Sequence, residues 1–325
     1  MAIISRAPTR IELCGESTDL PDYASKEGGF VINLAINKYS YIGLKPLNEG
    51  IKIVLDNKNS IEFPNLKSMK YEGDLDLIKS IVKTKCLSGQ EIFLRNDLPS
   101  NTGMGLNASI STALLGAITK LNNQAIDKAQ LSEESYRIGL KELGIKIGRQ
   151  NHYASAFGGI NSIEFKKDGS VAVTPLKVNR STLCELEKHL VLVYIGKRIN
   201  GLEKTREPEL PSKIHMDQLK ELAYEMKDSL ESGNINLFGK ILDKIWMVKK
   251  EIYPDSFTHY MDHLYRVAKN NGAIGGRVIG SGRGGHMLFY AEQNKETHLV
   301  KKLQENGARI IDFSIDLNGL EVWES

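Results

Sequence analysis

The stretch PSNTGMGLNASIST, residues 99–112, combines a glycine-rich loop with the start of an apolar helix pattern. Gly103 and Gly105 stand close together among small polar residues, and apolar residues then recur at helical spacing over 110–121. A glycine-rich loop in front of a helix can surround an anion with backbone N–H groups and the positive end of the helix dipole. The stretch therefore predicts a phosphate-binding loop, with an ordinary tight connection as the open alternative. It lacks the Gly-Lys-Ser/Thr sequence of the common phosphate loop.

A second glycine loop, GSGRGGH at 280–286, matches the pattern G-x-G-x-x-G at Gly280, Gly282 and Gly285. The dinucleotide-binding motif with this pattern requires a helix directly after the glycines. Here the next residues, HMLFYA at 286–291, have the composition of a strand. The stretch therefore predicts a hairpin, whose glycines either make the turn or let the backbone pass close to a neighbour.

A third stretch, IELCGESTDLPDYASKEGGFVINLAI at 11–36, places a polar loop between two strand patterns. Glu16, Ser17, Thr18 and Asp19 form the loop, and Gly28-Gly29 closes it. Carboxylate and hydroxyl groups are suitable hydrogen-bond partners for the hydroxyls of a polyol. A capped turn is the alternative for this stretch.

The composition excludes several classes of protein. The chain has 325 residues, enough for about two domains, and its 43 basic and 40 acidic residues give a net charge of only +3. This balance gives no reason to expect a nucleic-acid surface or a polybasic membrane anchor. Three widely spaced cysteines suit a reducing compartment, and no apolar run approaches the ~18 residues of a membrane span. We expect a cytoplasmic protein, monomeric or homodimeric, without nucleic-acid or membrane partners.

Taken together and in order, the three stretches resemble the motifs of the GHMP kinases, which include galactokinase, homoserine kinase, mevalonate kinase and phosphomevalonate kinase. The chain looks closest to kinases of D-glycero-D-manno-heptose 7-phosphate. The similar segments are SRAPTRIELCGESTDLPDY, LPSNTGMGLNAS, GRQNHYASAFGGIN and GAIGGRVIGSGRGGHMLFY. The resemblance implies an α+β fold of two domains: a ribosomal-protein-like, nucleotide phosphate-binding domain at 1–180 and a ferredoxin-like domain at 181–325. It also implies ATP and Mg²⁺, with the γ-phosphoryl group passed to a hydroxyl of a small phosphorylated sugar or polyol.

The resemblance assigns expected roles to residues of this chain. The catalytic candidates are Arg10, near the transferred phosphoryl group, and Asn151. The expected nucleotide-binding residues are Pro99, Ser100, Asn101, Thr102, Gly103, Met104, Gly105, Leu106, Asn107 and Ser109. The expected acceptor-binding residues are Glu16, Ser17, Thr18, Asp19 and Gly282, and the positive side chains of Arg149, His152 and Arg283 are added as candidates for a phosphate contact.

The glycine loop departs from the family pattern at the metal site. Family loops usually read PSGTGLGSSS, and a serine hydroxyl binds Mg²⁺. Here those serine positions hold LNA, residues 106–108, which leaves Ser109 as the nearest hydroxyl and the Asn107 carbonyl as a further oxygen. The usual acid about three helical turns before Asn151 falls on Gly139, with Glu142 nearby. Ser109 and Glu142 are therefore the metal candidates.

A second departure concerns the base. The family's QDQYAAAFGG is here QNHYASAFGG, so an amide, Asn151, replaces the aspartate that orients or deprotonates the acceptor hydroxyl. Phosphoryl transfer depends mainly on positioning, because its transition state is loose. Arg149 and His152 beside Asn151 are expected to add positive potential near an acceptor phosphate. The alternative is a surface arginine and a structurally hydrogen-bonded histidine.

Two other functions remain open at this stage. The changed acceptor loop, CGESTD in place of AGGGTD, makes a mevalonate-phosphate kinase of an isoprenoid pathway the second hypothesis. The missing aspartate and serines motivate a third, a non-catalytic sensor that binds a nucleotide or a sugar. ATP turnover distinguishes the sensor from both kinases.

Overall fold

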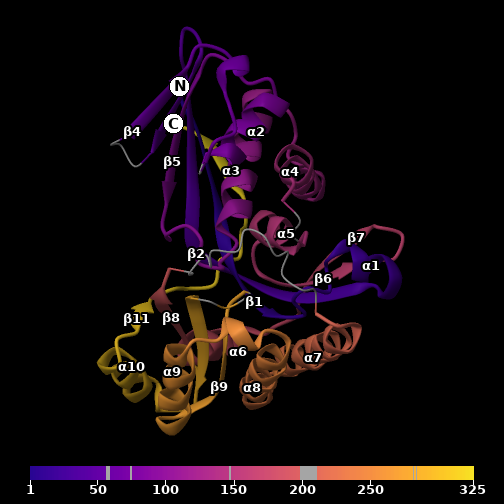
Figure 1. The fold of residues 1–325 in the computed structure, drawn as a ribbon, viewed down its shortest axis with the longest axis vertical. Helices are drawn as coiled ribbons and strands as arrows, with labels where there is room; N and C mark the ends of the chain where they lie inside the picture. The colour runs from indigo at the N-terminus through magenta and orange to yellow at the C-terminus, as the bar shows by residue number, and fades with distance from the viewer. Residues whose placement is uncertain (56–58, 74, 146–147, 198–210, 281, 283) are drawn as a thin grey trace.

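The computed structural model describes residues 1–55, 59–73, 75–145, 148–197, 211–280, 282 and 284–325. Each of its two halves combines a β-sheet with helices (Figure 1). This architecture agrees with the predicted α+β class. None of the helices in the described part of the chain is long and apolar enough to span a membrane.

The first half contains an eight-stranded sheet in the order β12-β1-β2-β5-β3-β4, and β6 pairs with both β2 and β7. Its strands are β1 (Ile3–Cys14), β2 (Gly29–Pro46), β3 (Ile51–Leu55), β4 (Asn59–Phe63), β5 (Gln90–Asn96), β6 (Ile160–Phe165), β7 (Val171–Pro175) and β12 (Glu321–Glu324). The accompanying helices are α1 (Pro21–Glu27), α2 (Asp76–Thr84), α3 (Leu106–Leu121), α4 (Lys128–Leu143) and α5 (Gln150–Phe157). The helices α2, α3 and α4 lie together on one face of the sheet (Figure 1).

The long strand β2 joins the parts of this sheet. Its β-branched and aromatic residues favour an extended chain, and its 18 residues pair first with β6 and then with β5. Its pairing with β1 changes register between Pro8 and Thr9. Irregularities of this kind redirect side chains and are common beside functional sites. Here the shift comes one residue before Arg10.

The second half contains a four-stranded antiparallel sheet in the order β11-β8-β10-β9. Its strands are β8 (Leu190–Gly196), β9 (Ala273–Val278), β10 (Gly285–Ala291) and β11 (Arg309–Ile311). Its helices are α6 (Arg180–His189), α7 (Lys213–Ser232), α8 (Ile235–Ile252), α9 (His259–Asn270) and α10 (Glu296–Glu305). Val278 pairs with Met287, which confirms the hairpin predicted around the second glycine loop.

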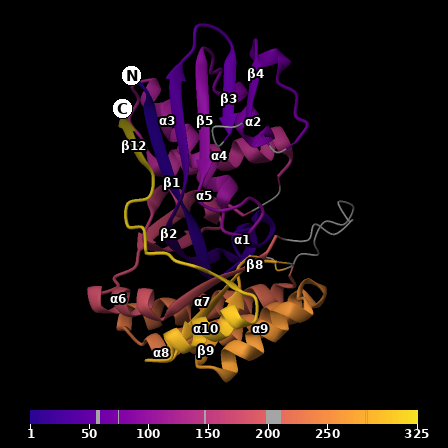
Figure 2. The same ribbon diagram turned by 90° about the vertical axis from the view of Figure 1, so that its left-hand side faces the viewer.

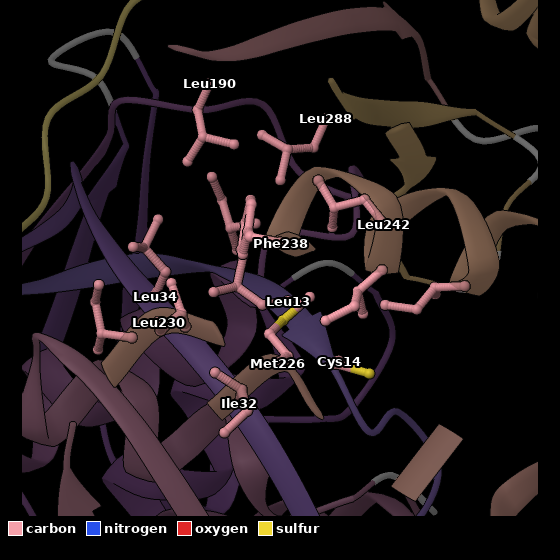
Figure 3. Close-up of a cluster of buried hydrophobic side chains, with 14 of the residues drawn as sticks. Leu13, Cys14, Ile32, Leu34, Leu190, Met226, Leu230, Phe238, Leu242 and Leu288 are labelled. Carbon is pink, nitrogen blue, oxygen red and sulfur yellow. The ribbon is translucent and has the colours of Figure 1, made fainter. Parts of the chain in front are cut away.

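The two halves share a hydrophobic cluster (Figure 3). Leu13 of β1 and Ile32 of β2 meet Met226 of α7 and Phe238 of α8 in it. All four side chains are fully buried, and removal of this apolar surface from water stabilises the contact between the halves. The shared cluster holds the end of β1 against the second half, and the polar loop at 16–19 begins just beyond that end.

The last strand corrects the predicted domain range of 181–325. β12 lies beside β1 in the first sheet (Figure 2), where Ile3 pairs with Glu324. The N–H of Ala2 also donates to Ser325 O at 3.0 Å. Residues 321–324 therefore return to the first half. The sequence did not reveal this, because a four-residue strand has almost no periodicity to detect.

Candidate active site

The glycine loop ends in the first turn of α3. Gly103 and Gly105 have φ angles of 85° and 73°, a region that residues with a side chain rarely adopt. Gly105 precedes the helix, and the N–H of Ser109 donates to its carbonyl at 3.1 Å. The helix itself makes no use of the N–H groups of residues 106–108, because the first turn has no carbonyl for them. This backbone arrangement suits a phosphate group.

Arg10 lies directly beside this loop. Its Nη1 donates to Gly103 O at 2.8 Å, and its Nε and Nη2 donate to Asn151 Oδ1 at 2.8 and 2.5 Å. Its backbone N–H donates to Met104 O at 3.1 Å. The structure thus brings Arg10, Asn151 and the glycine loop together, and a buried guanidinium lies between the loop and α5.

The start of α5 fixes the position of Asn151. Gln150 donates its backbone N–H to Asp19 Oδ2 at 3.0 Å, and its Nε2 bridges Asp19 Oδ1 and Glu12 Oε1 at 3.2 and 2.7 Å. A carboxylate at this place pairs an N–H that the helix leaves unused and complements the helix dipole. Asp19 therefore anchors the helix that carries Asn151. Its expected role toward the acceptor stays a prediction.

Asp19 is enclosed at this position. Its side chain is buried, and a Cβ on Gly148 would collide with the carboxyl group. Burial, with a smaller contribution from the nearby Glu12, raises the pKa of Asp19 to about 6 against the opposing hydrogen bonds from Gln150. The carboxyl therefore changes its protonation close to neutral pH.

This raised pKa predicts a pH dependence of stability. Asp19 binds a proton more tightly in the folded chain than at its ordinary pKa of 3.8. Its stabilising contribution is therefore complete below about pH 4 and is lost as the pH rises through about 6. We expect the free energy of unfolding of the wild type to fall relative to Asp19→Asn by up to about 3 kcal/mol between these limits.

Urea denaturation of both proteins from pH 4 to 7.5 measures this difference. Asp22→Asn serves as the control, because Asp22 is exposed at the start of α1. The control should follow the pH dependence of the wild type. A constant difference between Asp19→Asn and the wild type across the range would contradict the assignment.

The other residues of the polar loop differ in their access to solvent. Thr18 is fully buried, and its hydroxyl donates to Gly15 O at 2.7 Å and accepts from the N–H of Phe30 at 3.1 Å. These contacts show a structural role and contradict its expected contact with an acceptor. Ser17 is partly exposed with a φ of 67°, so it remains an acceptor candidate.

Glu16 contacts the second half of the molecule. Its Oε1 accepts from Arg277 Nη2 of β9 at 2.6 Å and from Lys249 Nζ of α8 at 2.9 Å. Burial alone would raise the pKa of the Glu16 carboxyl, but Arg277 and Lys249 outweigh burial and lower it to about 2. Glu16 is therefore a carboxylate at neutral pH.

Sequence reasoning missed Arg277 and Lys249, although one of them leaves a signal. Leu242, Ile245 and Lys249 follow one another at helical spacings of three and four, so the lysine falls on the apolar face of α8. A lysine on such a face is expected to have a buried partner. Arg277 shows no comparable pattern within β9.

The second glycine loop packs against the first. A Cβ on Gly285 would collide with the carbonyl of Thr102, and His286 Nδ1 lies 3.1 Å from the same oxygen. Gly285 also has a φ of 89°, so glycine is required here for both reasons. Gly282 is buried, and a Cβ on it would lie 3.0 Å from Ser256 O, so its expected contact with the acceptor stays a prediction. Arg283 lies outside the described residues.

Arg149 and His152 both form hydrogen bonds within the protein. Arg149 Nη1 donates to Glu133 Oε1 at 3.1 Å and to Gly169 O at 3.0 Å. His152 is buried with its Nδ1 2.7 Å from Ser135 Oγ, and burial lowers its pKa to about 4. A neutral imidazole adds no positive potential. The expectation that His152 adds positive charge near an acceptor phosphate is therefore wrong, and the alternative of a structurally hydrogen-bonded histidine holds. Arg149 already has an anionic partner, Glu133.

The predicted metal pair is also not assembled. Ser109 Oγ donates to Ala7 O at 2.7 Å and accepts from the N–H of Ser40 at 3.2 Å, so its hydroxyl joins α3 to the sheet. Glu142 is exposed and accepts from Tyr71 Oη at 3.1 Å. These contacts contradict a metal site shared by Ser109 and Glu142. No group of three or more His, Cys, Asp or Glu side chains suited to a metal occurs in the described ranges.

Two family models match the chain. The GHMP kinases N terminal domain matches residues 75–159, and the GHMP kinases C terminal domain matches residues 226–309. The first range contains the glycine loop and Asn151. The second contains Lys249, Arg277 and the second glycine loop.

Individual relatives extend over nearly the whole chain. A D-glycero-α-D-manno-heptose 7-phosphate kinase of Campylobacter jejuni is 29% identical over 99% of this chain and 98% of its own length. The crystal structure of a D-glycero-D-manno-heptose 1-phosphate kinase of Bacteroides thetaiotaomicron has a TM-score of 0.84 at 26% identity, and the match covers 99% of each chain. Methanococcus jannaschii mevalonate kinase has a TM-score of 0.71 at 20% identity and covers 96% of this chain and 98% of its own, which shows the shared fold alone.

Proposed function

Because the chain belongs to the GHMP kinases, we propose that it transfers the γ-phosphoryl group of ATP to a hydroxyl of a sugar phosphate. The relatives from Campylobacter jejuni and Bacteroides thetaiotaomicron are named for heptose 7-phosphate and heptose 1-phosphate. Heptose phosphates are therefore the first acceptors to test. The observation that carries the proposal is the place of Arg10, whose guanidinium joins Gly103 of the glycine loop to Asn151.

In this proposal the backbone N–H groups at the start of α3 hold the nucleotide phosphates. The Arg10 guanidinium offsets the negative charge on the transferring group, at a place fixed before the substrates bind. Asn151 orients Arg10, because its Oδ1 accepts two hydrogen bonds from that guanidinium. An amide cannot take the acceptor's proton, so the proposed catalysis rests on positioning and charge rather than on a strong base.

Mg²⁺ is part of the proposal, and this chain would supply few of the ligands of the ion. The ion keeps several waters and binds substrate phosphates, so it needs few side chains. Asn107 is exposed in the first turn of α3, and its amide oxygen is the donor that suits the ion there. When bound, Mg²⁺ would supply charge that offsets the phosphates. The cytoplasmic location, the lack of a nucleic-acid partner and the monomeric or homodimeric state stay predictions.

A panel of acceptors tests the proposed function. Purified protein with ATP and Mg²⁺ is offered heptose 7-phosphate, heptose 1-phosphate, hexose phosphates and mevalonate phosphates, and ADP release is measured. We expect turnover with a sugar phosphate. Turnover with a mevalonate phosphate alone would support the isoprenoid hypothesis, and nucleotide binding without any turnover would support the sensor.

Asn151 provides a test of the positioning mechanism. Asn151→Ala removes two hydrogen bonds to Arg10 but leaves the contact of Arg10 with Gly103. We expect kcat to fall by less than about tenfold, because loss of a true general base costs about 10²–10⁴-fold. Asn151→Asp should lower kcat further, since a carboxylate would neutralise the guanidinium that faces the transferring group. A thousandfold loss in Asn151→Ala would instead make Asn151 indispensable to the chemistry.

A further inference from the structure

Lys249 and Arg277 form a charged junction with Glu16 at the contact between the two halves. Lys249 is 1% exposed and Arg277 is 0% exposed, and both donate to the same oxygen, Oε1 of Glu16. Arg277 also donates through Nη1 to Leu13 O at 2.7 Å. Two cations of the second half therefore bind the polar loop, and one of them, Arg277, also binds the end of β1.

The other carboxylate oxygen of Glu16 is left without a partner. Oε2 is buried and accepts no hydrogen bond from any residue that the structure describes. A buried, unpaired carboxylate oxygen is costly, so a native protein retains one where a ligand or water completes it. Glu16 stands next to Ser17, the partly exposed residue of the same loop. Oε2 is therefore the oxygen of Glu16 that can still accept a hydrogen bond.

Lys249 also connects this loop to the second glycine loop. Its Nζ donates to Gly280 O and lies 3.4 Å from Val278 O. Five residues further on, Gly285 packs against Thr102 of the phosphate loop. Lys249 thus contacts Glu16 of the polar loop directly. It also contacts the second glycine loop, which in turn packs against the phosphate loop.

We propose that Lys249 and Arg277 are positioning residues for the phosphoryl acceptor, holding Glu16 ionised and oriented so that its Oε2 accepts a hydrogen bond from an acceptor hydroxyl. This inference rests on the proposed kinase function. It assigns the two cations a task that neither the glycine loop nor Arg10 performs. A hydroxyl is a suitable donor for a charged oxygen, and a bond of this type is among the stronger ones in proteins.

The charges around the junction determine its response to pH. The titratable groups that act on Glu16 or Lys249 are Arg10 and Glu12 of β1, Cys14 at the end of β1, Tyr253 after α8, and Arg277 of β9. Burial raises the pKa of Glu16, and the two cations lower it. Removing one cation should therefore raise the pKa of Glu16 toward the working pH range.

The decisive variant is Lys249→Met, with Lys250→Met as its matched control. Lys250 is the next residue on α8 and pairs with Asp262 near the surface. We expect Lys249→Met to raise the KM for the sugar phosphate about tenfold or more and to leave the KM for ATP unchanged. It should also give the pH profile of kcat/KM for the acceptor a new acid limb. A profile and acceptor KM equal to those of Lys250→Met would overturn the proposal.

A double-mutant cycle with Glu16→Gln protects the test against a folding defect. Glu16→Gln/Lys249→Met removes one charge of each sign, so it should fold even where the lysine variant does not. We expect its acceptor KM to equal that of Glu16→Gln alone, because Lys249 acts through Glu16. Additive effects would overturn the proposal. Absence of turnover in both wild type and Lys250→Met would instead reject the kinase function itself.

Discussion

Replacement of Arg10 by alanine is expected to lower kcat by about 10³-fold. It should also lower stability, because the buried carboxylates of Glu12, Asp19 and Glu16 lose a nearby cation. The guanidinium is buried between Gly103 O and Asn151 Oδ1, so it contacts both the glycine loop and α5. Charge fixed at the transferring group acts in the transition state, so its loss should appear in kcat more than in the substrate KM values.

Arg6→Ala is the matched control for this variant. Arg6 lies on the same strand and donates to Glu321 at the edge of the sheet. We expect it to keep wild-type kcat. Steady-state kinetics, together with a thermal melt of each variant, measures both effects. A nearly silent Arg10→Ala beside a thousandfold loss in Asn151→Ala would reverse the roles proposed for these two residues.

Gly105→Val is expected to weaken ATP binding by about a hundredfold or more while the chain still folds. The residue has a φ of 73°, which a β-branched side chain tolerates poorly. A Cβ there would also stand 3.4 Å from Arg10 Cγ, so the larger valine would press on the guanidinium and on any bound phosphate. Calorimetric titration with ATP measures the affinity.

Gly169→Val is the control that separates the effect of backbone strain from the effect of a side chain close to the bound phosphate. Gly169 has a φ of 86° in the turn between β6 and β7, and a Cβ on this residue would meet no atom within 4 Å. The substitution therefore imposes similar backbone strain far from the glycine loop in sequence. We expect it to lower the melting temperature without changing ATP affinity. Wild-type ATP affinity in a folded Gly105→Val would reject the phosphate-loop interpretation.

The sequence predicted those parts of the site that depend on local chain geometry. The loop at Gly103 and Gly105 and the helix after it follow from glycine φ preferences and from the helical period, both of which act within a few residues. The hairpin at 280–285 was predicted in the same way, from the strand composition that follows its glycines. The predictions that failed depended on contacts with residues far away in the sequence. Whether His152 carries a charge and whether Ser109 can bind a metal depend on neighbours such as Ser135 and Ala7.

Local sequence was enough to predict a glycine loop in front of a helix, and the family resemblance grouped two further loops with it and identified Asn151 at the position of the family's aspartate. The partners of the buried charges became visible only in the folded chain. Glu16 and Arg277 are 261 positions apart, and Asp19 caps a helix that begins 131 positions later. The cost of burying a charge is offset only by specific partners. Those partners come from distant segments, and only the packing of the two halves identifies them.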